Sequence, residues 1–215
     1  MLRKCSIVVL SLLCSALCAG EPQNLAFAKK ALARYHDSQE YGHQIIVVVN
    51  HAMDYLKTHL DKKFSKKPAI ILDIDETSLS NYQDIARMNF GGTIEDIDHA
   101  IATGKDPAIQ PTLKLYQYAE DHHIAIFFVT GRSQTLHDAT IQNLKKVGFH
   151  DWQGIYFRPP HYQEKTIAIY KTAAREQIEK QGYHIVLNLG DQLSDLEGGH
   201  ADKTYKLPNP YYFLP

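Results

Sequence analysis

The chain of 215 residues is long enough for one well-buried domain and short for two. Its composition is that of an ordinary globular protein, and its 23 basic and 24 acidic residues give a formal net charge of -1. This balance gives no reason to expect a nucleic-acid polymer as a partner, and no run of lysine or arginine is long enough to alter that expectation.

The first twenty residues are typical of an export signal. Arg3 and Lys4 give a positive start, and residues 5–17 form an apolar segment too short to span a bilayer well. Small residues follow, and we expect cleavage after Gly20. An uncleaved anchor and a lipidated cysteine are the alternatives. All three cysteines lie in this segment, so the mature protein, periplasmic or secreted, would hold no thiol and no lasting membrane span.

The segment that follows, residues 21–68, is predicted to form one or two helices that pack on the core. Its apolar residues recur with helical spacing, at positions 45, 46, 49, 52, 53 and 56. The alternative is a membrane or partner helix, which so ordinary a stripe favours less.

From residue 69 onward, apolar strands alternate with helical segments. Strands are expected at 69–73, 124–130, 155–158, 185–190 and, as a short fifth, 205–207, with helices at 111–121, 133–147 and 165–181. Nearly continuous apolar strands indicate a sheet covered by helices on both faces. The pattern predicts a single domain over 21–215, with a doubly wound, mainly parallel α/β core over 69–215. The short segment 78–110 fits a small helical lid.

Three of these strands run directly into chemically reactive residues. The sequences are DIDET at 73–77, TGR at 130–132 and GDQLSD at 190–195, and Lys171 lies in the helical segment between the last two. Ligands bind at the carboxyl ends of strands in open α/β sheets. The set contains four carboxylates, a hydroxyl and an ammonium, which are the groups needed for phosphoryl transfer with a divalent metal.

The spacing of the carboxylates indicates why a metal is expected. Asp73 and Asp75 point the same way in extended chain, and Asp191 and Asp195 share one face of a helical turn. Carboxylates held side by side repel one another unless a cation lies between them. A hard cation such as Mg²⁺ prefers such oxygen ligands.

These residues resemble the haloacid dehalogenase superfamily of phosphatases. The motifs are DIDETSLSNY (73–82), FFVTGR (127–132), YKTAAR (170–175), GYHIVLNLGDQLSDL (182–196) and YKLPNP (205–210). They extend in the family's order from about residue 67 to the C-terminus. They are similar to the acid phosphatase branch, subfamily IIIB, with class B and class C acid phosphatases and plant vegetative storage proteins. The resemblance implies the Rossmann-like core of that superfamily.

The resemblance also implies roles for the first motif. Asp73 would be the nucleophile that forms an aspartyl-phosphate, and Asp75 the general acid and then the base for water. Glu76 and Thr77 are expected to cap and start the following helix. The candidates for stacking on an aromatic leaving group are Tyr82, Trp152, Tyr162, Tyr211 and Tyr212, with Tyr82 the best placed, but ordinary packing is favoured for each of them.

The second and third motifs would hold the phosphate. Thr130 and Gly131 supply a hydroxyl and close backbone approach, which together make a phosphate cradle. Arg132 either holds phosphate or braces the loop, and bracing is favoured. Lys171 matches the lysine that neutralises the phosphate and the nucleophile, with Lys165 as its rival.

The fourth motif completes the implied metal site. The protein ligands of Mg²⁺ would be Asp73, the backbone carbonyl of Asp75, and Asp191, with Asp195 acting directly or through water. The predicted function is an exported, Mg²⁺-dependent hydrolase of small phosphomonoesters, with nucleoside monophosphates as candidates. The alternatives are a catalytically weak storage or binding protein and a phosphotransferase. Asp at position 73 favours the enzyme, and a homodimer is left open.

Overall fold

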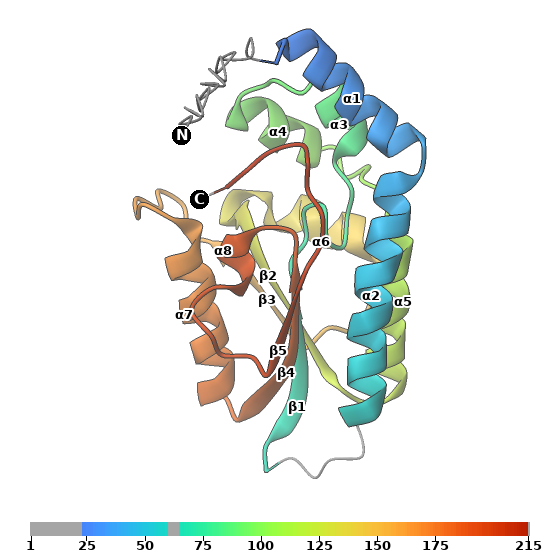
Figure 1. Ribbon diagram of the computed structural model, residues 1–215. Helices are drawn as coiled ribbons and strands as arrows, with labels where there is room; N and C mark the ends of the chain where they lie inside the picture. The colour runs from blue at the N-terminus through green and yellow to red at the C-terminus, as the bar shows by residue number, and fades with distance from the viewer. Residues whose placement is uncertain (1–22, 60–64, 215) are drawn as a thin grey trace, which may run out of the picture.

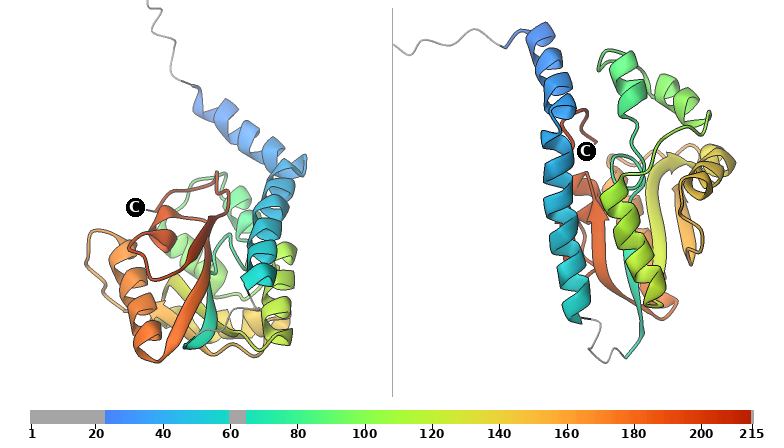
Figure 2. Two further views of the ribbon diagram at one scale, coloured as in Figure 1. Left: turned by 60° about the horizontal axis from the view of Figure 1, so that its bottom comes forward. Right: turned by 90° about the vertical axis from the view of Figure 1, so that its right-hand side faces the viewer.

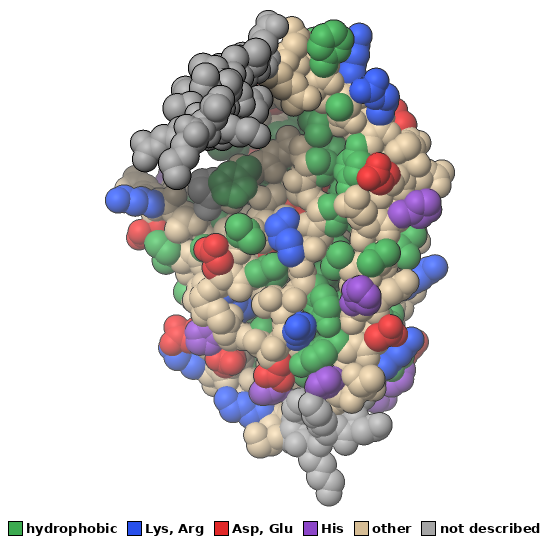
Figure 3. Space-filling view, viewed as in Figure 1, with side chains coloured by type: hydrophobic (Ala, Val, Ile, Leu, Met, Phe, Trp, Pro, Cys, Tyr) green, Lys and Arg blue, Asp and Glu red, His purple; other side chains and the backbone are tan. Residues whose placement is uncertain are grey.

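The computed structural model describes residues 23–59 and 65–214. The predicted signal segment, 1–20, lies outside the described residues, so its cleavage stays a prediction. No helix within the described ranges is long and apolar enough to cross a membrane. Side chains of both charges are interspersed over the face seen in Figure 3.

Five strands form one sheet in the order β3-β2-β1-β4-β5, and every neighbouring pair is parallel. The prediction of a doubly wound, mainly parallel sheet is therefore confirmed. The strands are β1 (Lys67–Leu72), β2 (Ala125–Ser133), β3 (Gly154–Arg158), β4 (Tyr183–Gly190) and β5 (Lys203–Lys206). Because β1 lies between β2 and β4, the residues that follow these three parallel strands lie side by side at the carboxyl end of the sheet.

Helices cover both faces of the sheet (Figure 1). α2 (Glu40–His59) and α5 (Gln110–Asp121) pack on one face with Ile70 and Leu72 of β1. α7 (Ile167–Lys180) packs on the other face with Ala69 and Ile71. Successive side chains of β1 thus point to opposite faces of the sheet, with the period of two that a strand imposes. The side chains on both faces are buried because helices cover both faces.

The predicted helix 133–147 begins later than expected. β2 continues through Ser133, a short 3₁₀ turn covers Gln134–Leu136, and α6 is His137–Lys146. The hydroxyl of Ser133 accepts from the backbone N–H of Thr135 and caps this turn. The pairing of β2 with β3 shifts register between Thr130 and Ser133, so the strand bends where the TGR motif lies.

The remaining helices lie above the carboxyl ends of the strands. α3 (Tyr82–Arg87) and α4 (Ile94–Ile101) occupy the insertion predicted as a small helical lid, and α8 (Leu193–Leu196) follows β4. α1 (Leu25–Asp37) has no buried side chain and extends beyond the sheet and its covering helices, as Figure 2 shows. The chain after β5 returns across this same end of the molecule.

Candidate active site

The ends of β1 and β4 place three aspartates together. The N–H of Asp73 donates to a β4 carbonyl oxygen at 3.0 Å, so the two strands stay paired up to the point where Asp73 begins the loop. Asp191 follows Gly190, the last residue of β4. Asp195 is held by α8, where the N–H of Gln192 donates to its Oδ2 at 2.8 Å. A Cβ at Gly190 would collide with Asp195, so this placement needs glycine.

These aspartates form a buried cluster with one lysine. Asp73, Asp191 and Asp195 each offer a carboxylate oxygen, and the three oxygens lie within 4.8 Å of one another. Lys171 of α7 donates through Nζ to Asp73 Oδ1 at 2.6 Å and also to Asp195 Oδ1. All four side chains are buried. One ammonium therefore faces three carboxylates.

The electrostatics of the cluster follow from this excess of negative charge. Burial, Asp195 and Asp191 raise the pKa of Asp73 well above its ordinary value, although Lys171 opposes them. Burial and Asp195 raise the pKa of Asp191 to about 7. Burial alone would lower the pKa of Lys171, but Asp195 and Asp73 outweigh it and raise that pKa. The lysine stays charged, and the carboxylates would gain from a second cation.

The side chain of Asp75 is turned away from the cluster and towards Arg132. The guanidinium donates from Nη2 to Asp75 Oδ1 at 2.8 Å and from Nε to both carboxylate oxygens, at 3.0 and 3.2 Å. Asn81 Nδ2 donates to the same Oδ1 at 2.6 Å. Burial alone would raise the pKa of Asp75, but Arg132 and Asn81 outweigh it and lower that pKa.

Arg132 braces the loop, as the sequence favoured. Besides Asp75, its guanidinium contacts Asp106 Oδ2 at 3.2 Å and Thr140 Oγ1 at 3.2 Å, and it is buried. Asp106 closes the insertion that carries α3 and α4, so one arginine ties the lid to Asp75. Thr140, on α6, anchors the far side of the guanidinium.

The predicted phosphate-binding residues lie at different depths. Thr130 is fully buried, and its Oγ1 accepts from the N–H of Arg132 at 3.1 Å. Gly131 lines the cavity described below, and its carbonyl accepts from Arg158 Nε at 2.9 Å. Lys171 reaches the cluster, whereas its rival Lys165 lies on the cavity wall.

The expectation that Glu76 and Thr77 start a helix is wrong. Residues 74–79 form a turn with Glu76 in the left-handed region (φ +48°), and the next helix begins only at Tyr82. Both side chains are used inside the site instead of capping. The Glu76 carboxylate is buried and accepts from the N–H of Asn81 at 2.7 Å, and Thr77 Oγ1 donates to Asp191 Oδ1 at 3.3 Å.

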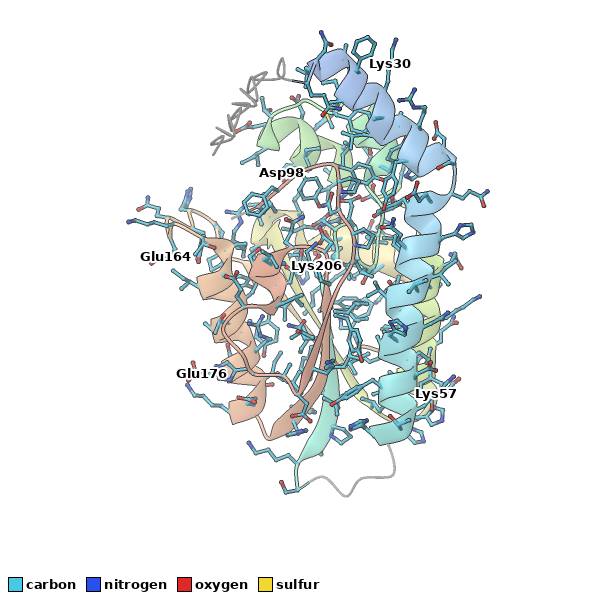
Figure 4. The ribbon with its side chains drawn as sticks, in the orientation of Figure 1. Lys30, Lys57, Asp98, Glu164, Glu176 and Lys206 are labelled. Carbon is cyan, nitrogen blue, oxygen red and sulfur yellow. The ribbon has the colours of Figure 1, made fainter. Side chains whose placement is uncertain are left out.

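A cavity of about 610 Å³ opens above Asp73 and Lys171. The lid supplies apolar side chains to its wall, and the loop between β3 and α7 supplies polar ones. Figure 4 labels one lining residue from each of these segments, Asp98 of α4 and Glu164 of the loop. The C-terminal residues add Tyr211, Tyr212 and Leu214.

Tyr82 packs within the fold, which the sequence favoured over stacking on a leaving group. Its ring stacks on the ring of His36 of α1, its hydroxyl donates to Asp37 Oδ1 at 3.4 Å, and it does not line the cavity. The aromatic residues that do line the cavity are Tyr162, Tyr211 and Tyr212, with Phe90 of the lid. Tyr82 packs on α1 because its ring and the ring of His36 are both shielded from water by this contact.

Two site residues, Asn81 and Asn209, were not predicted from the sequence, and Tyr212 was named only as a candidate for stacking. Asn81 holds Asp75, Asn209 donates from Nδ2 to Asp191 Oδ2 at 2.7 Å, and Tyr212 donates from its hydroxyl to Glu76 Oε2 at 2.6 Å. Asn81 and Asn209 stand inside quoted motifs, DIDETSLSNY and YKLPNP, and that position was the available signal. Tyr212 lies just beyond the second motif, and no pattern in the sequence indicated its contact with Glu76.

Comparison with known proteins agrees with this arrangement of residues. The family model described as HAD superfamily, subfamily IIIB (Acid phosphatase) matches residues 11–215. The chain belongs to this family. Family membership, together with a class C acid phosphatase as a structural neighbour, supports phosphatase activity.

Two relatives and one solved structure show the range of the family. Acid phosphatase 1 of Solanum lycopersicum is 35% identical over 81% of this chain and 69% of its own length. Vegetative storage protein 1 of Arabidopsis thaliana is 33% identical over 67% of this chain and 55% of its own length. The structure of the class C acid phosphatase from Bacillus anthracis superposes with a TM-score of 0.75 at 25% identity, covering 88% of this chain and 86% of that one.

Proposed function

We propose that this acid phosphatase is a Mg²⁺-dependent phosphomonoesterase that works through an aspartyl-phosphate on Asp73. The observation that carries the proposal is the buried Asp73 at the end of β1, which lies 2.6 Å from Lys171 Nζ and lines the cavity. A nucleophile needs to meet a dianionic phosphate without being repelled by it. Lys171 supplies positive charge to both partners at that point.

The donor set fits a hard divalent cation. Asp73, Asp191 and Asp195 provide oxygen atoms within 4.8 Å of one another, and one lysine leaves them with excess negative charge. Mg²⁺ prefers oxygen ligands and keeps several waters. We assign these three aspartates and the backbone carbonyl of Asp75 as its ligands. The bound ion would neutralise charge on the transferring phosphoryl group.

The two halves of the reaction place different demands on Asp75. In the first half, an Asp73 oxygen bonds to phosphorus, the ester bond breaks, and Asp75 gives its proton to the leaving oxygen. In the second, Asp75 takes a proton from the water that attacks the aspartyl-phosphate, which releases phosphate and restores Asp73. The lowered pKa of Asp75 suits the base. As an acid, Asp75 must carry a proton, so hydrolysis of esters whose leaving group needs that proton should be faster in acidic solution.

The cavity walls support a leaving group with an apolar or aromatic face, and we propose nucleoside monophosphates. Ile97, Ile101 and Phe90 of the lid face the cavity together with Tyr211. Phosphate release from a nucleoside 5′-monophosphate is expected to show a higher kcat/KM than release from a sugar phosphate of similar charge. A panel of phosphomonoesters in Mg²⁺ buffer across pH 4 to 8 measures this. Equal or better turnover of the sugar phosphate would contradict the assignment of the walls.

The same panel separates this proposal from the storage alternative. The similarity to Vegetative storage protein 1 is the reason to test that alternative. A storage or binding protein would release no phosphate from any ester. Adding an alcohol acceptor tests phosphotransfer, because a phosphotransferase would give a new ester in place of free phosphate.

We also propose that the protein is exported after cleavage near Gly20. The support is the charged start and short apolar segment of residues 1–20. Intact-mass analysis of the exported protein should give a chain that begins near Glu21. A mass that includes residues 1–20, or an added lipid, would contradict simple secretion.

A further inference from the structure

The segment after β5 crosses the site, and beyond lining the cavity it has no role in the mechanism above. We call residues 207–214 the C-terminal strap. It starts at the buried Leu207, whose N–H donates to Gly190 O at 2.8 Å, and it ends where the N–H of Leu214 donates to Gln192 Oε1 at 3.1 Å. Gly190 and Gln192 are the residues on either side of Asp191. The strap is therefore attached to the β4 end of the sheet at two points.

Between these points the strap contacts both catalytic loops. Asn209 Nδ2 donates to Asp191 Oδ2 at 2.7 Å, and the hydroxyl of Tyr212 donates to Glu76 Oε2 at 2.6 Å. Glu76 belongs to the loop after β1, and Asp191 to the loop after β4. One short segment thus fixes the relative position of the two loops that supply the proposed metal ligands.

Asn209 uses both ends of its amide. Nδ2 donates to Asp191, while Oδ1 accepts from the N–H of Tyr211 at 2.8 Å and the N–H of Tyr212 at 3.4 Å. Pro208 and Pro210 flank it and restrict the backbone before and after it. The oxygen shapes the strap and the nitrogen reaches Asp191. No other uncharged side chain of this size offers a donor and an acceptor in that arrangement.

The contacts of Asp191 show what the donor does. Its Oδ2 accepts from two amides, Asn209 Nδ2 at 2.7 Å and Gln192 Nε2 at 2.6 Å. Its Oδ1 has the longer contact with Thr77 Oγ1, at 3.3 Å. The two amides fix the plane of the carboxylate and occupy one oxygen. The other oxygen has only the longer contact with Thr77, and we assign it to the cation.

We propose that Asn209 is a positioning residue for the metal site, which orients Asp191 and thereby sets the affinity for Mg²⁺. The inference rests on the proposed Mg²⁺ dependence. Outer groups that orient a metal ligand typically contribute about 10- to 100-fold to metal affinity. Asn209 would act through Asp191 and touch neither the phosphate nor the ion.

Three variants separate orientation of Asp191 from general support of the strap. Asn209→Ala removes both ends of the amide. Asn209→Asp keeps an acceptor for the strap N–H groups but replaces the donor to Asp191 with a repelling carboxylate. Asn143→Ala is the matched control, because Asn143 is a buried amide whose contacts, at 2.9 and 2.7 Å, are to the backbone of Asp106 and not to the metal cluster.

The test is calorimetric titration of each metal-free protein with Mg²⁺, together with the Mg²⁺ concentration that half-restores activity. Both Asn209 variants are expected to bind Mg²⁺ about 10- to 100-fold more weakly than the wild type. Saturating Mg²⁺ should restore most of the kcat of Asn209→Ala. Asn143→Ala should lower the thermal midpoint and leave Mg²⁺ affinity unchanged.

Two outcomes would overturn the inference. Asn209→Asp could bind Mg²⁺ as tightly as the wild type, which would mean that only the acceptor matters and that Asn209 merely shapes the strap. Alternatively, Asn143→Ala could weaken binding as much as Asn209→Ala, which would make the loss a general effect of destabilisation. Failure of the wild-type protein itself to bind Mg²⁺ would instead contradict the proposed function, so the two failures are distinguishable.

Discussion

Asp73→Asn is expected to lower phosphate release by a factor on the order of 10⁴ or more while the protein remains folded. The substitution keeps the shape of the side chain and removes the attacking oxygen's charge. It also removes one of three carboxylates that face a single lysine. The metal-free variant should therefore unfold at a higher temperature than the metal-free wild type at neutral pH.

The matched control is Asp121→Asn, at the exposed C-terminal end of α5 and outside the cavity. It should leave turnover and the thermal midpoint unchanged. Near wild-type turnover in Asp73→Asn would show that the reaction does not proceed through this carboxylate. An inactive variant with a lowered midpoint would show instead that Asp73 supports the fold.

Removal of divalent metal is expected to abolish activity, and Mg²⁺ should restore it. Mg²⁺ should also raise the thermal midpoint, because an ion that binds only the folded protein stabilises it by about 2.7 kcal/mol at a concentration of 100 Kd. Dialysis against a chelator, followed by assays and thermal scans with and without Mg²⁺, measures both effects. In Asp191→Ala, Mg²⁺ should neither restore activity nor raise the thermal midpoint.

The rise in the thermal midpoint on adding Mg²⁺ should depend on pH. Burial and neighbouring carboxylates raise the pKa of Asp73, and they raise that of Asp191 to about 7. The metal-free fold therefore binds protons more tightly than the unfolded chain does. The contribution of these two carboxyls to its stability is fully present below the ordinary carboxyl pKa and is lost as the pH rises through about 7. Mg²⁺ offsets that loss, so its effect should be larger at pH 7.5 than at pH 5. Full activity in excess chelator after exhaustive dialysis would contradict the metal assignment.

The sequence predicted those features that depend on local pattern. Continuous apolar runs located the strands, and their expected parallel direction placed Asp73 and Asp191 at the carboxyl end of the sheet. That β1 and β4 are neighbours is a finding of the structure. Lys171 was found through its motif, and the structure brings it to Asp73. These predictions needed only the direction of each strand and the residue that follows it.

Contacts between distant segments could not be predicted in this way. Glu76 was expected to cap the following helix, but its partner Tyr212 lies at the far end of the chain. Asn209 reaches Asp191 only because the strap returns across the site. Tyr82 was near the site in sequence, yet the path of α1 brought His36 against its ring. Each case depends on a chain path that no local pattern encodes.

The central claim is that a phosphoryl group passes through Asp73, and trapping it in Asp75→Asn is the most direct test. Nitrophenol leaves without needing a proton, so the first step should proceed with nitrophenyl phosphate. Loss of the base should slow the second step by about a hundredfold or more, so the intermediate should accumulate. Rapid mixing should show a burst of nitrophenol, and acid-quenched protein should carry one phosphoryl group on the peptide that contains Asp73. A reaction without a burst, or a phosphoryl group on any other residue, would contradict the account.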